Sequence, residues 1–122
     1  MRVLLDSVIL IDHFNGVTAA SAYLVETQGR SAVSVITRAE VLTGVKGPEE
    51  GLAKSLLDRF PTLSIDREAA DKAATLRRAH RWKLPDAFQA ALAQRHGLKL
   101  ATRNERDFPP KDFEFVVVPY RV

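Results

Sequence analysis

Short apolar runs alternate with longer segments of helical spacing along the whole chain. The first run, Val3-Leu4-Leu5, is continuously apolar, which is typical of a strand buried on both faces. A later run, residues 32–36, is rich in β-branched residues, which favour strands. The predicted strands are residues 3–5, 32–36, 63–65, 98–101 and 113–119.

Between these runs, apolar residues recur at helical spacing. Asp66 is expected to cap the helix that follows it, and Gly97 to end the helix that Asp86 begins. The predicted helices are residues 7–15, 18–28, 37–44, 48–60, 67–82 and 86–96. Strands that alternate with helices predict the α/β class, here a central, mostly parallel five-stranded sheet in a three-layer α/β/α sandwich. The length predicts one domain, residues 1–122.

Polar side chains follow the strands at the edge where the carboxyl ends of a parallel sheet meet. Asp6 follows the first strand, Glu40 comes soon after the second, and Asp86 lies at the start of its helix. Asn104 and Asp107 follow the fourth strand. Because α/β proteins bind ligands at this edge, we expect the functional site there.

Each of these residues also has a purely structural interpretation. Asp6 can cap the helix that follows it. Thr37-Arg38-Ala39-Glu40 spells a capping box, in which Glu40 folds back onto the Thr37 amide. A carboxylate in the first turn of a helix, such as that of Asp86, is favoured by the helix dipole. The polar pair after the fourth strand can cap its own turn.

Taken together, several carboxylates at one edge would repel one another unless a cation compensates their charge. Hard divalent ions such as Mg²⁺ and Mn²⁺ bind carboxylate oxygens and water in such sites. The chain has no cysteine, and its three histidines show no metal-binding spacing, so zinc is not expected. The residues therefore predict a magnesium or manganese site.

Composition narrows the class of protein only slightly. The net charge of +3 permits an anionic partner such as nucleic acid without establishing one. No apolar run has the length of a membrane span, and Asp6 and Asp12 interrupt the apolar start, so we expect neither a membrane segment nor a signal peptide. The lack of cysteine fits a cytoplasmic protein.

No Gly-rich phosphate loop is present, and a carboxylate-held Mg²⁺ indicates phosphodiester chemistry.

Four motifs in order resemble those of PIN domains. They are Asp6-Ser7, Thr37-x-x-Glu40, Leu84-Pro85-Asp86-Ala87, and the segment Leu100 to Phe108, which reads LATRNERDF. Each motif alone is weak, but together they span the chain at the intervals of the family. Within that family the chain most resembles the VapC toxins of bacterial toxin–antitoxin pairs.

The resemblance implies an endoribonuclease that depends on Mg²⁺, with Mn²⁺ as a substitute, and that hydrolyses RNA with a metal-activated water. It implies that Asp6, Glu40 and Asp86 are the catalytic residues and form the metal pocket, with Asp6 and Asp86 as the most direct ligands. Residues Ser7 and Thr102 match hydroxyls that orient carboxylates or water.

Two further features of the pocket stay open at the level of sequence. Many family members have a fourth acid where this chain has Asn104, so either Asn104 itself or Asp107 completes the pocket. Arg38 and Arg103 are neighbours of pocket residues in sequence, and either can contact an RNA phosphate or balance the carboxylates. The basic run 77–83 is a candidate for RNA contacts or a solvated helix face, and Trp82 within it is expected in the core.

The resemblance also implies partners. These are a small VapB-type antitoxin whose tail covers the acidic pocket, and a second copy of the chain in a homodimer. The RNA substrate expected from the family is tRNA or rRNA.

Two other classes of protein fit parts of the pattern. A receiver-type phosphoacceptor domain is also α/β and of this length, with Asp66 and Thr102 in candidate positions. However, Asp6 has no paired acid and the last predicted strand has no lysine. A catalytically silent RNA-binding module on the PIN fold would tolerate loss of the acids, yet all three are present. Binding of Mn²⁺ separates this module from the nuclease.

Overall fold

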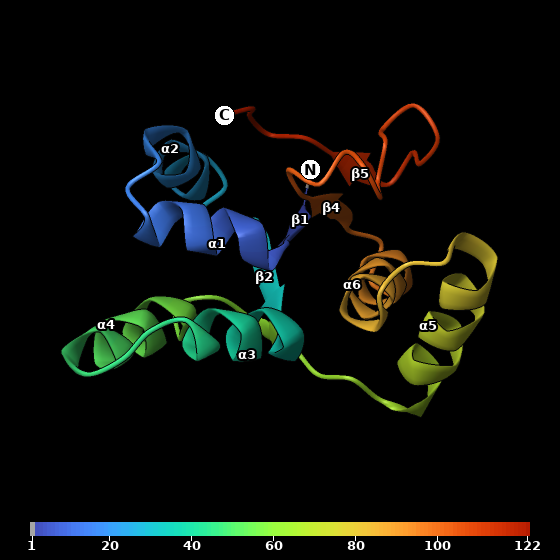
Figure 1. The fold of residues 1–122 in the computed structure, drawn as a ribbon, viewed down its shortest axis with the longest axis horizontal. Helices are drawn as coiled ribbons and strands as arrows, with labels where there is room; N and C mark the ends of the chain where they lie inside the picture. The colour runs from blue at the N-terminus through green and yellow to red at the C-terminus, as the bar shows by residue number, and fades with distance from the viewer. Residues whose placement is uncertain (1) are drawn as a thin grey trace.

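The computed structural model describes residues 2–122, and its central feature is one parallel five-stranded sheet with the order β3-β2-β1-β4-β5 (Figure 1). The strands are β1 (Val3–Leu5), β2 (Ser31–Ser34), β3 (Thr62–Leu63), β4 (Lys99–Ala101) and β5 (Val116–Val117). The helices are α1 (Ser7–Phe14), α2 (Thr18–Glu26), α3 (Val35–Thr43), α4 (Pro48–Leu57), α5 (Arg67–His80) and α6 (Leu84–Arg95). The predicted α/β class is confirmed.

Strand β1 lies at the centre of the sheet and is fully buried on both faces, as its continuous apolar sequence predicts. Because side chains of a strand alternate between faces, Val3 and Leu5 pack in one hydrophobic cluster and Leu4 in another. The first cluster is completed by α1 to α4 and the second by α5 and α6. Figure 1 shows these two groups of helices on opposite sides of the sheet, which makes the three-layer sandwich.

The structure corrects the predicted boundary between β2 and α3. The strand ends at Ser34, and the helix begins at Val35 rather than at Thr37. The hydroxyl of Ser34 accepts a hydrogen bond from the Thr37 N–H at 3.1 Å, so Ser34 is the N-cap and Thr37 lies within the first turn. The predicted capping box is therefore wrong, and Glu40 is exposed one turn further along the helix.

Other element ends also differ from the prediction. Helix α5 stops at His80, because Arg81 adopts a left-handed conformation with φ of 59°. Only Val116 and Val117 of the predicted last strand pair in the sheet. The preceding Phe113 turns instead toward Trp82, with ring centroids 5.2 Å apart. Among the described residues, no helix is long and apolar enough to cross a membrane.

The strand order places the functional edge between two particular strands. The chain builds β2 and β3 on one side of β1 and then crosses to the other side for β4. In such a sheet, ligands bind outside the carboxyl ends of the strands at this reversal, which here lies between β1 and β4. A receiver-type site is excluded by the same order, because β3 is an outer strand separated from β1 by β2. Asp66, which follows β3, instead caps α5 as predicted and pairs with Arg95.

Candidate active site at the carboxyl edge of the sheet

Asp6 occupies the centre of this edge, directly after β1. Its N–H donates to the Ala101 carbonyl at 2.9 Å, which ties it to the end of β4. The residue is 6% exposed, and its carboxylate accepts hydrogen bonds from the Ser7 N–H at 2.9 Å and the Thr102 hydroxyl at 2.6 Å. Burial nevertheless raises the pKa of Asp6, and the charge of Glu40 raises it further. Asp6 is thus both the predicted helix cap and a desolvated carboxylate.

Asp86 brings a second carboxylate to the edge from the first turn of α6. Partial burial, followed by the charges of Asp6, Asp107 and Glu40, raises the pKa of Asp86 to about 6, against an opposing effect of Lys83. Within residues 2–122, no hydrogen-bond donor or ion-pair partner contacts its side chain. The negative charges that the sequence places at this edge are therefore close enough to act on one another, and no ion pair among the described residues compensates them.

Asn104 and Asp107 form a closed pair in the loop after β4. The Asn104 side chain accepts from the Asp107 N–H at 3.2 Å, which confirms the predicted cap, and donates to the Asp107 carboxylate at 3.0 Å. The Asp107 carbonyl accepts from the indole N–H of Trp82 at 2.9 Å. Trp82 itself is 4% exposed, so its predicted place in the core is confirmed. Asn104 thus orients Asp107, the member of the pair whose charge acts on Asp86.

A buried glutamine that the sequence analysis missed joins the elements that carry the acids. Gln89 is 1% exposed and lies one turn after Asp86 on α6. Its carbonyl oxygen accepts from the Ser34 hydroxyl at 2.8 Å, and its amide donates to the Thr37 hydroxyl at 2.7 Å. The Thr37 hydroxyl in turn donates to the Leu5 carbonyl at 3.3 Å. A polar residue three positions after Asp86, within the otherwise apolar run from Ala87 to Ala93, is the signal that marks it in the sequence.

This network leads to a prediction for stability. Replacing Gln89 with leucine removes the hydrogen bonds that its side chain makes with the buried hydroxyls of Ser34 and Thr37, so we expect the free energy of unfolding to fall by about 1–3 kcal/mol. Gln94→Leu, an exposed position of the same helix, is the matched control and should change it by less than about 0.5 kcal/mol. Urea denaturation measures both. Equal effects of the two substitutions would contradict a stabilising role for the network.

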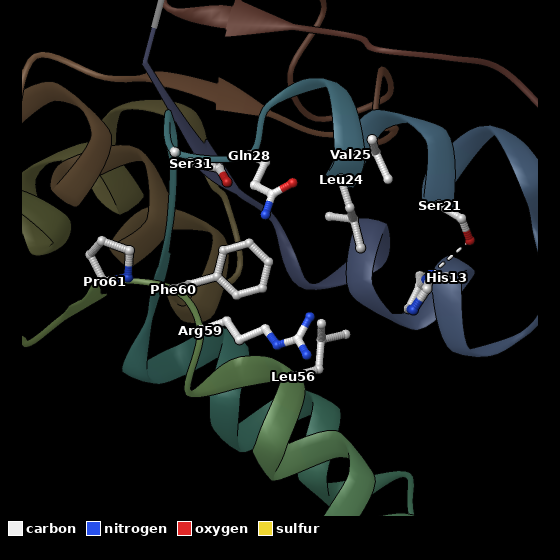
Figure 2. Close-up of a pocket in the computed structure, with 11 residues that line it drawn as sticks. His13, Ser21, Leu24, Val25, Gln28, Ser31, Leu56, Arg59, Phe60 and Pro61 are labelled. Atoms are coloured by element: carbon white, nitrogen blue, oxygen red, sulfur yellow. Dashed lines mark hydrogen bonds between the residues drawn. The ribbon is translucent and has the colours of Figure 1, made fainter.

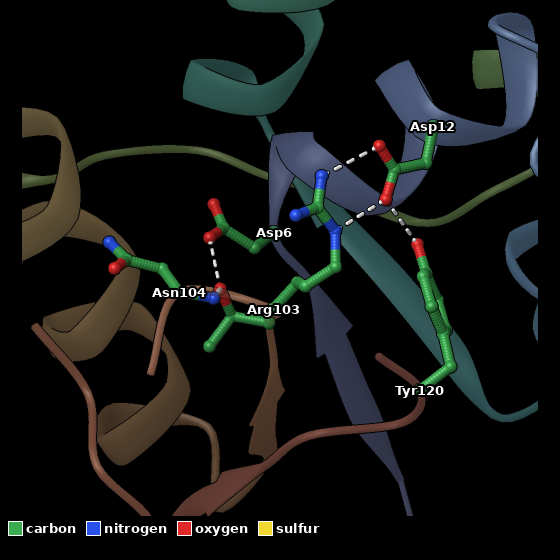
Figure 3. Close-up of polar contacts among 6 residues, drawn as sticks. Asp6, Asp12, Arg103, Asn104 and Tyr120 are labelled. Carbon is green, nitrogen blue, oxygen red and sulfur yellow. Dashed lines mark hydrogen bonds and ion pairs between the residues drawn. The ribbon is translucent and has the colours of Figure 1, made fainter. Parts of the chain in front are cut away.

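The two candidate arginines are both engaged, but not with the acids of the edge. Arg38 pairs with Asp58 at 2.7 Å. Arg103 binds Asp12 through two hydrogen bonds, from Nε at 2.7 Å and from Nη2 at 2.9 Å (Figure 3). Among the described residues, neither arginine forms an ion pair with the carboxylates of the edge, so the structure does not show either of them balancing those charges. Contact with an RNA phosphate stays a prediction.

The oxygen-rich edge suits a hard divalent cation. Asp6 and Asp86 are desolvated carboxylates with raised pKa values, and Glu40 and Asp107 add two more charges. Among residues 2–122, no three Asp, Glu, His or Cys side chains form a ready-made cage. Mg²⁺ needs none, because it is commonly held by one or two carboxylates and keeps several waters. The donor set thus fits Mg²⁺ and offers nothing to a thiolate- or imidazole-bound metal.

A cavity of about 440 Å³ lies elsewhere, between α2 and the end of α4, at the amino end of β2 (Figure 2). Its walls are mainly apolar, with Leu24, Leu56 and Phe60 among them. His13 and Ser21 form a hydrogen bond of 2.7 Å at its rim. Within the described chain no carboxylate pairs with His13, so the two do not make a Ser-His-acid triad. This cavity is separate from the acidic edge.

Comparisons with known proteins find relatives over nearly the whole chain. The family model of the PIN domain matches residues 3–114. "Ribonuclease VapC10" from Mycobacterium tuberculosis is 38% identical over 127 residues, covering 98% of this chain and 94% of that protein. A toxin–antitoxin complex from Klebsiella pneumoniae contains a chain 37% identical, with a TM-score of 0.92 and coverage of 99% of this chain and 100% of that one.

A more distant structure shares the fold. FitAcB from Neisseria gonorrhoeae is 23% identical with a TM-score of 0.79, covering 97% of this chain and 98% of that one. The chain therefore belongs to the PIN domain family. Within the family it is VapC-like over nearly its full length, as the four sequence motifs predict.

Proposed function

We propose that the chain is a Mg²⁺-dependent endoribonuclease and the toxin of a type II toxin–antitoxin pair. The observation that carries the proposal is the uncompensated acidic edge, where burial and neighbouring carboxylates raise the pKa of Asp86 to about 6. Repulsion between these carboxylates does not stabilise the folded protein, so we infer that the carboxylates are placed together to bind a cation. The similarity to a named ribonuclease and to a toxin–antitoxin complex supports RNA as the substrate.

Each residue of the edge has its own role in this proposal. Asp6 and Asp86 hold the cation, Glu40 adds charge from α3, and Asp107, oriented by Asn104, supplies the fourth carboxylate. A divalent cation bound there supplies an activated water and offsets charge that develops on the phosphate and the leaving oxygen. The hydroxyl of Thr102 keeps the Asp6 carboxylate in place, while Ser7 contributes its backbone N–H. These two hydrogen bonds therefore hold the Asp6 carboxylate in one orientation.

The proposed partners follow from the same similarity. The Klebsiella pneumoniae relative was solved as a toxin–antitoxin complex, which supports a small VapB-type antitoxin for this chain. A homodimer, and tRNA or rRNA as the substrate, are part of the proposal on the strength of the family resemblance.

Cleavage of a single-stranded RNA by the purified chain tests the proposal. We expect cleavage with Mg²⁺, none with EDTA, and recovery when Mg²⁺ or Mn²⁺ is restored. Asp86→Asn should be inactive, whereas Asp71→Asn, an equal charge change on the exposed face of α5, should retain full activity. Undiminished cleavage in EDTA would rule out the metal-dependent mechanism.

The raised pKa of Asp86 predicts an unusual dependence of stability on pH. Without metal, the folded chain holds a proton at Asp86 that the unfolded chain releases between pH 6 and the ordinary value near 4. The melting temperature should therefore rise by a few degrees as the pH falls from 7 to 5. The pKa of Asp12 is lowered by Arg103, so its stabilising effect persists throughout this range and is lost only below about pH 4.

Added Mn²⁺ should reverse this dependence of the melting temperature on pH, because the ion binds the deprotonated carboxylate. Its stabilising effect should be largest near pH 8 and should shrink below pH 6. Thermal melts with and without Mn²⁺ from pH 5 to pH 8 measure both effects, and Asp86→Asn should lack them. A metal-free melting temperature that falls steadily from pH 7 to pH 5 would contradict the assignment.

A further inference from the structure

Asp12 is a buried carboxylate that the metal site does not use. It lies in α1 two turns after Asp6, and its side chain is 8% exposed. Arg103 donates to both of its oxygens, and the hydroxyl of Tyr120 donates to Oδ2 at 2.8 Å. The three groups come from α1, from the loop after β4 and from the segment after β5, so folding alone brings them together. A partly buried, bidentate arginine–carboxylate pair favours one geometry.

The pair leaves part of the Arg103 guanidinium free. Asp12 engages Nε and Nη2, and no described group accepts from Nη1. Figure 3 shows the guanidinium between the carboxylates of Asp6 and Asp12, with this third nitrogen directed toward the side of Asp6. Arg103 also follows Thr102 directly, whose hydroxyl binds Asp6, and its side chain is 31% exposed. The free nitrogen is therefore available at the acidic edge.

An arginine beside the acidic edge requires a partner that keeps its guanidinium away from Asp6. Without Asp12, the guanidinium would be drawn to the carboxylate of Asp6, where it would compete with a cation for the same oxygens. Asp12 supplies a better-placed partner, because it satisfies two nitrogens at once and Tyr120 fixes it in turn. The remaining nitrogen, Nη1, is then directed toward the acidic edge. A phosphate that approaches this edge is repelled by the four carboxylates there, so a positively charged group beside them favours its binding.

From this arrangement we infer that Arg103 binds a phosphate of the RNA strand beside the metal site, and that Asp12 and Tyr120 are the positioning residues that hold it there. The inference rests on the proposed function, because it names the substrate contact of the same site. It also assigns a role to the C-terminal segment, whose Tyr120 contacts Asp12. Arg38, the other candidate, is held by Asp58 and has no such place.

Binding of a fluorescent single-stranded RNA, measured by anisotropy in EDTA, tests this inference without requiring cleavage. We expect Arg103→Gln to weaken binding about tenfold, and to reduce the slope of log affinity against log salt concentration by about 1. Arg106→Gln, an exposed arginine of the same loop with no ion pair among the described residues, is the control with equal charge change. An unchanged affinity and salt slope in Arg103→Gln would overturn the inference.

The positioning role is tested by a double-mutant cycle. Asp12→Asn should weaken RNA binding about fivefold in the wild-type chain and have no further effect in Arg103→Gln, because it acts through Arg103. It should also lower Mn²⁺ affinity, since the released guanidinium turns to Asp6. Tyr120→Phe removes one hydrogen bond, leaves the ion pair intact, and should weaken RNA binding about twofold. Additive effects of Asp12→Asn and Arg103→Gln would show that Asp12 is merely structural and would overturn the positioning role.

The outcomes separate this inference from the proposed function. If wild-type protein cleaves RNA but Arg103→Gln binds and cleaves it as well as wild type does, only the inference fails. If wild-type protein cleaves no RNA with Mg²⁺ or Mn²⁺, the proposed function fails, and the anisotropy experiment still decides whether Arg103 contacts a phosphate.

Discussion

Asp6→Asn should reduce cleavage of single-stranded RNA by about 1000-fold or more, which corresponds to about 4 kcal/mol of activation free energy. Asp6 is the buried carboxylate at the centre of the acidic edge, and asparagine keeps its shape while removing its charge. The fold should survive, because the amide oxygen can still accept from the Ser7 N–H and because a desolvated charge is lost. Initial rates with Mg²⁺, together with circular dichroism and thermal melts, measure the two effects.

The matched control is Asp112→Asn, which makes the same charge change at an exposed loop position before β5. It should leave the rate unchanged within about twofold. Expression in bacteria gives a second readout, since wild type should arrest growth and Asp6→Asn should not. Full activity in a well-folded Asp6→Asn protein would refute the assignment of this edge as the active site.

Trp82→Ala should lower the free energy of unfolding by about 3–5 kcal/mol, the usual cost of truncating a buried aromatic side chain. The indole packs against Phe108 and Phe113, with ring centroids at 4.6 and 5.2 Å, and its N–H donates to the Asp107 carbonyl. It therefore holds together the start of α6 and the loop that carries Asp107. Urea denaturation measures the loss.

Two further variants separate the contributions of Trp82. Trp82→Phe keeps most of the packing and loses the hydrogen bond, so we expect a loss of about 1 kcal/mol from that bond plus the cost of the smaller ring. Leu52→Ala truncates a leucine that is 70% exposed and should cost less than about 0.5 kcal/mol. A Trp82→Ala protein as stable as Leu52→Ala would show that the ring is not part of the core.

The strong local signals of the sequence account for the architecture and for the set of acids. A continuously apolar β1, followed at once by Asp6, predicts a strand buried on both faces with a carboxylate at its end. The boundary of β2 was less predictable, because Val35 and Ile36 favour strands while the hydroxyl of Ser34 caps the helix they begin. A tertiary contact decides this competition, since Gln89 binds Ser34 from another helix.

Residues that act through partners far along the chain were beyond the sequence analysis. Gln89 contacts Ser34 and Thr37 across more than fifty positions, and no local pattern encodes that distance. Asp12 was recognised only as a charge that interrupts an apolar run, because its partners Arg103 and Tyr120 lie near the other end of the chain. Side-chain pairs of this kind depend on strand order, which the sequence alone does not specify.

The most direct test of the central claim, that this edge is a divalent-metal site, is a calorimetric titration of Mn²⁺ into the wild-type chain and into Asp6→Asn at pH 8. Both proteins must first show the same circular dichroism spectrum. The account predicts saturable binding to wild type and a loss of at least tenfold in affinity for Asp6→Asn. No binding to wild type, or equal binding to both proteins, would contradict it.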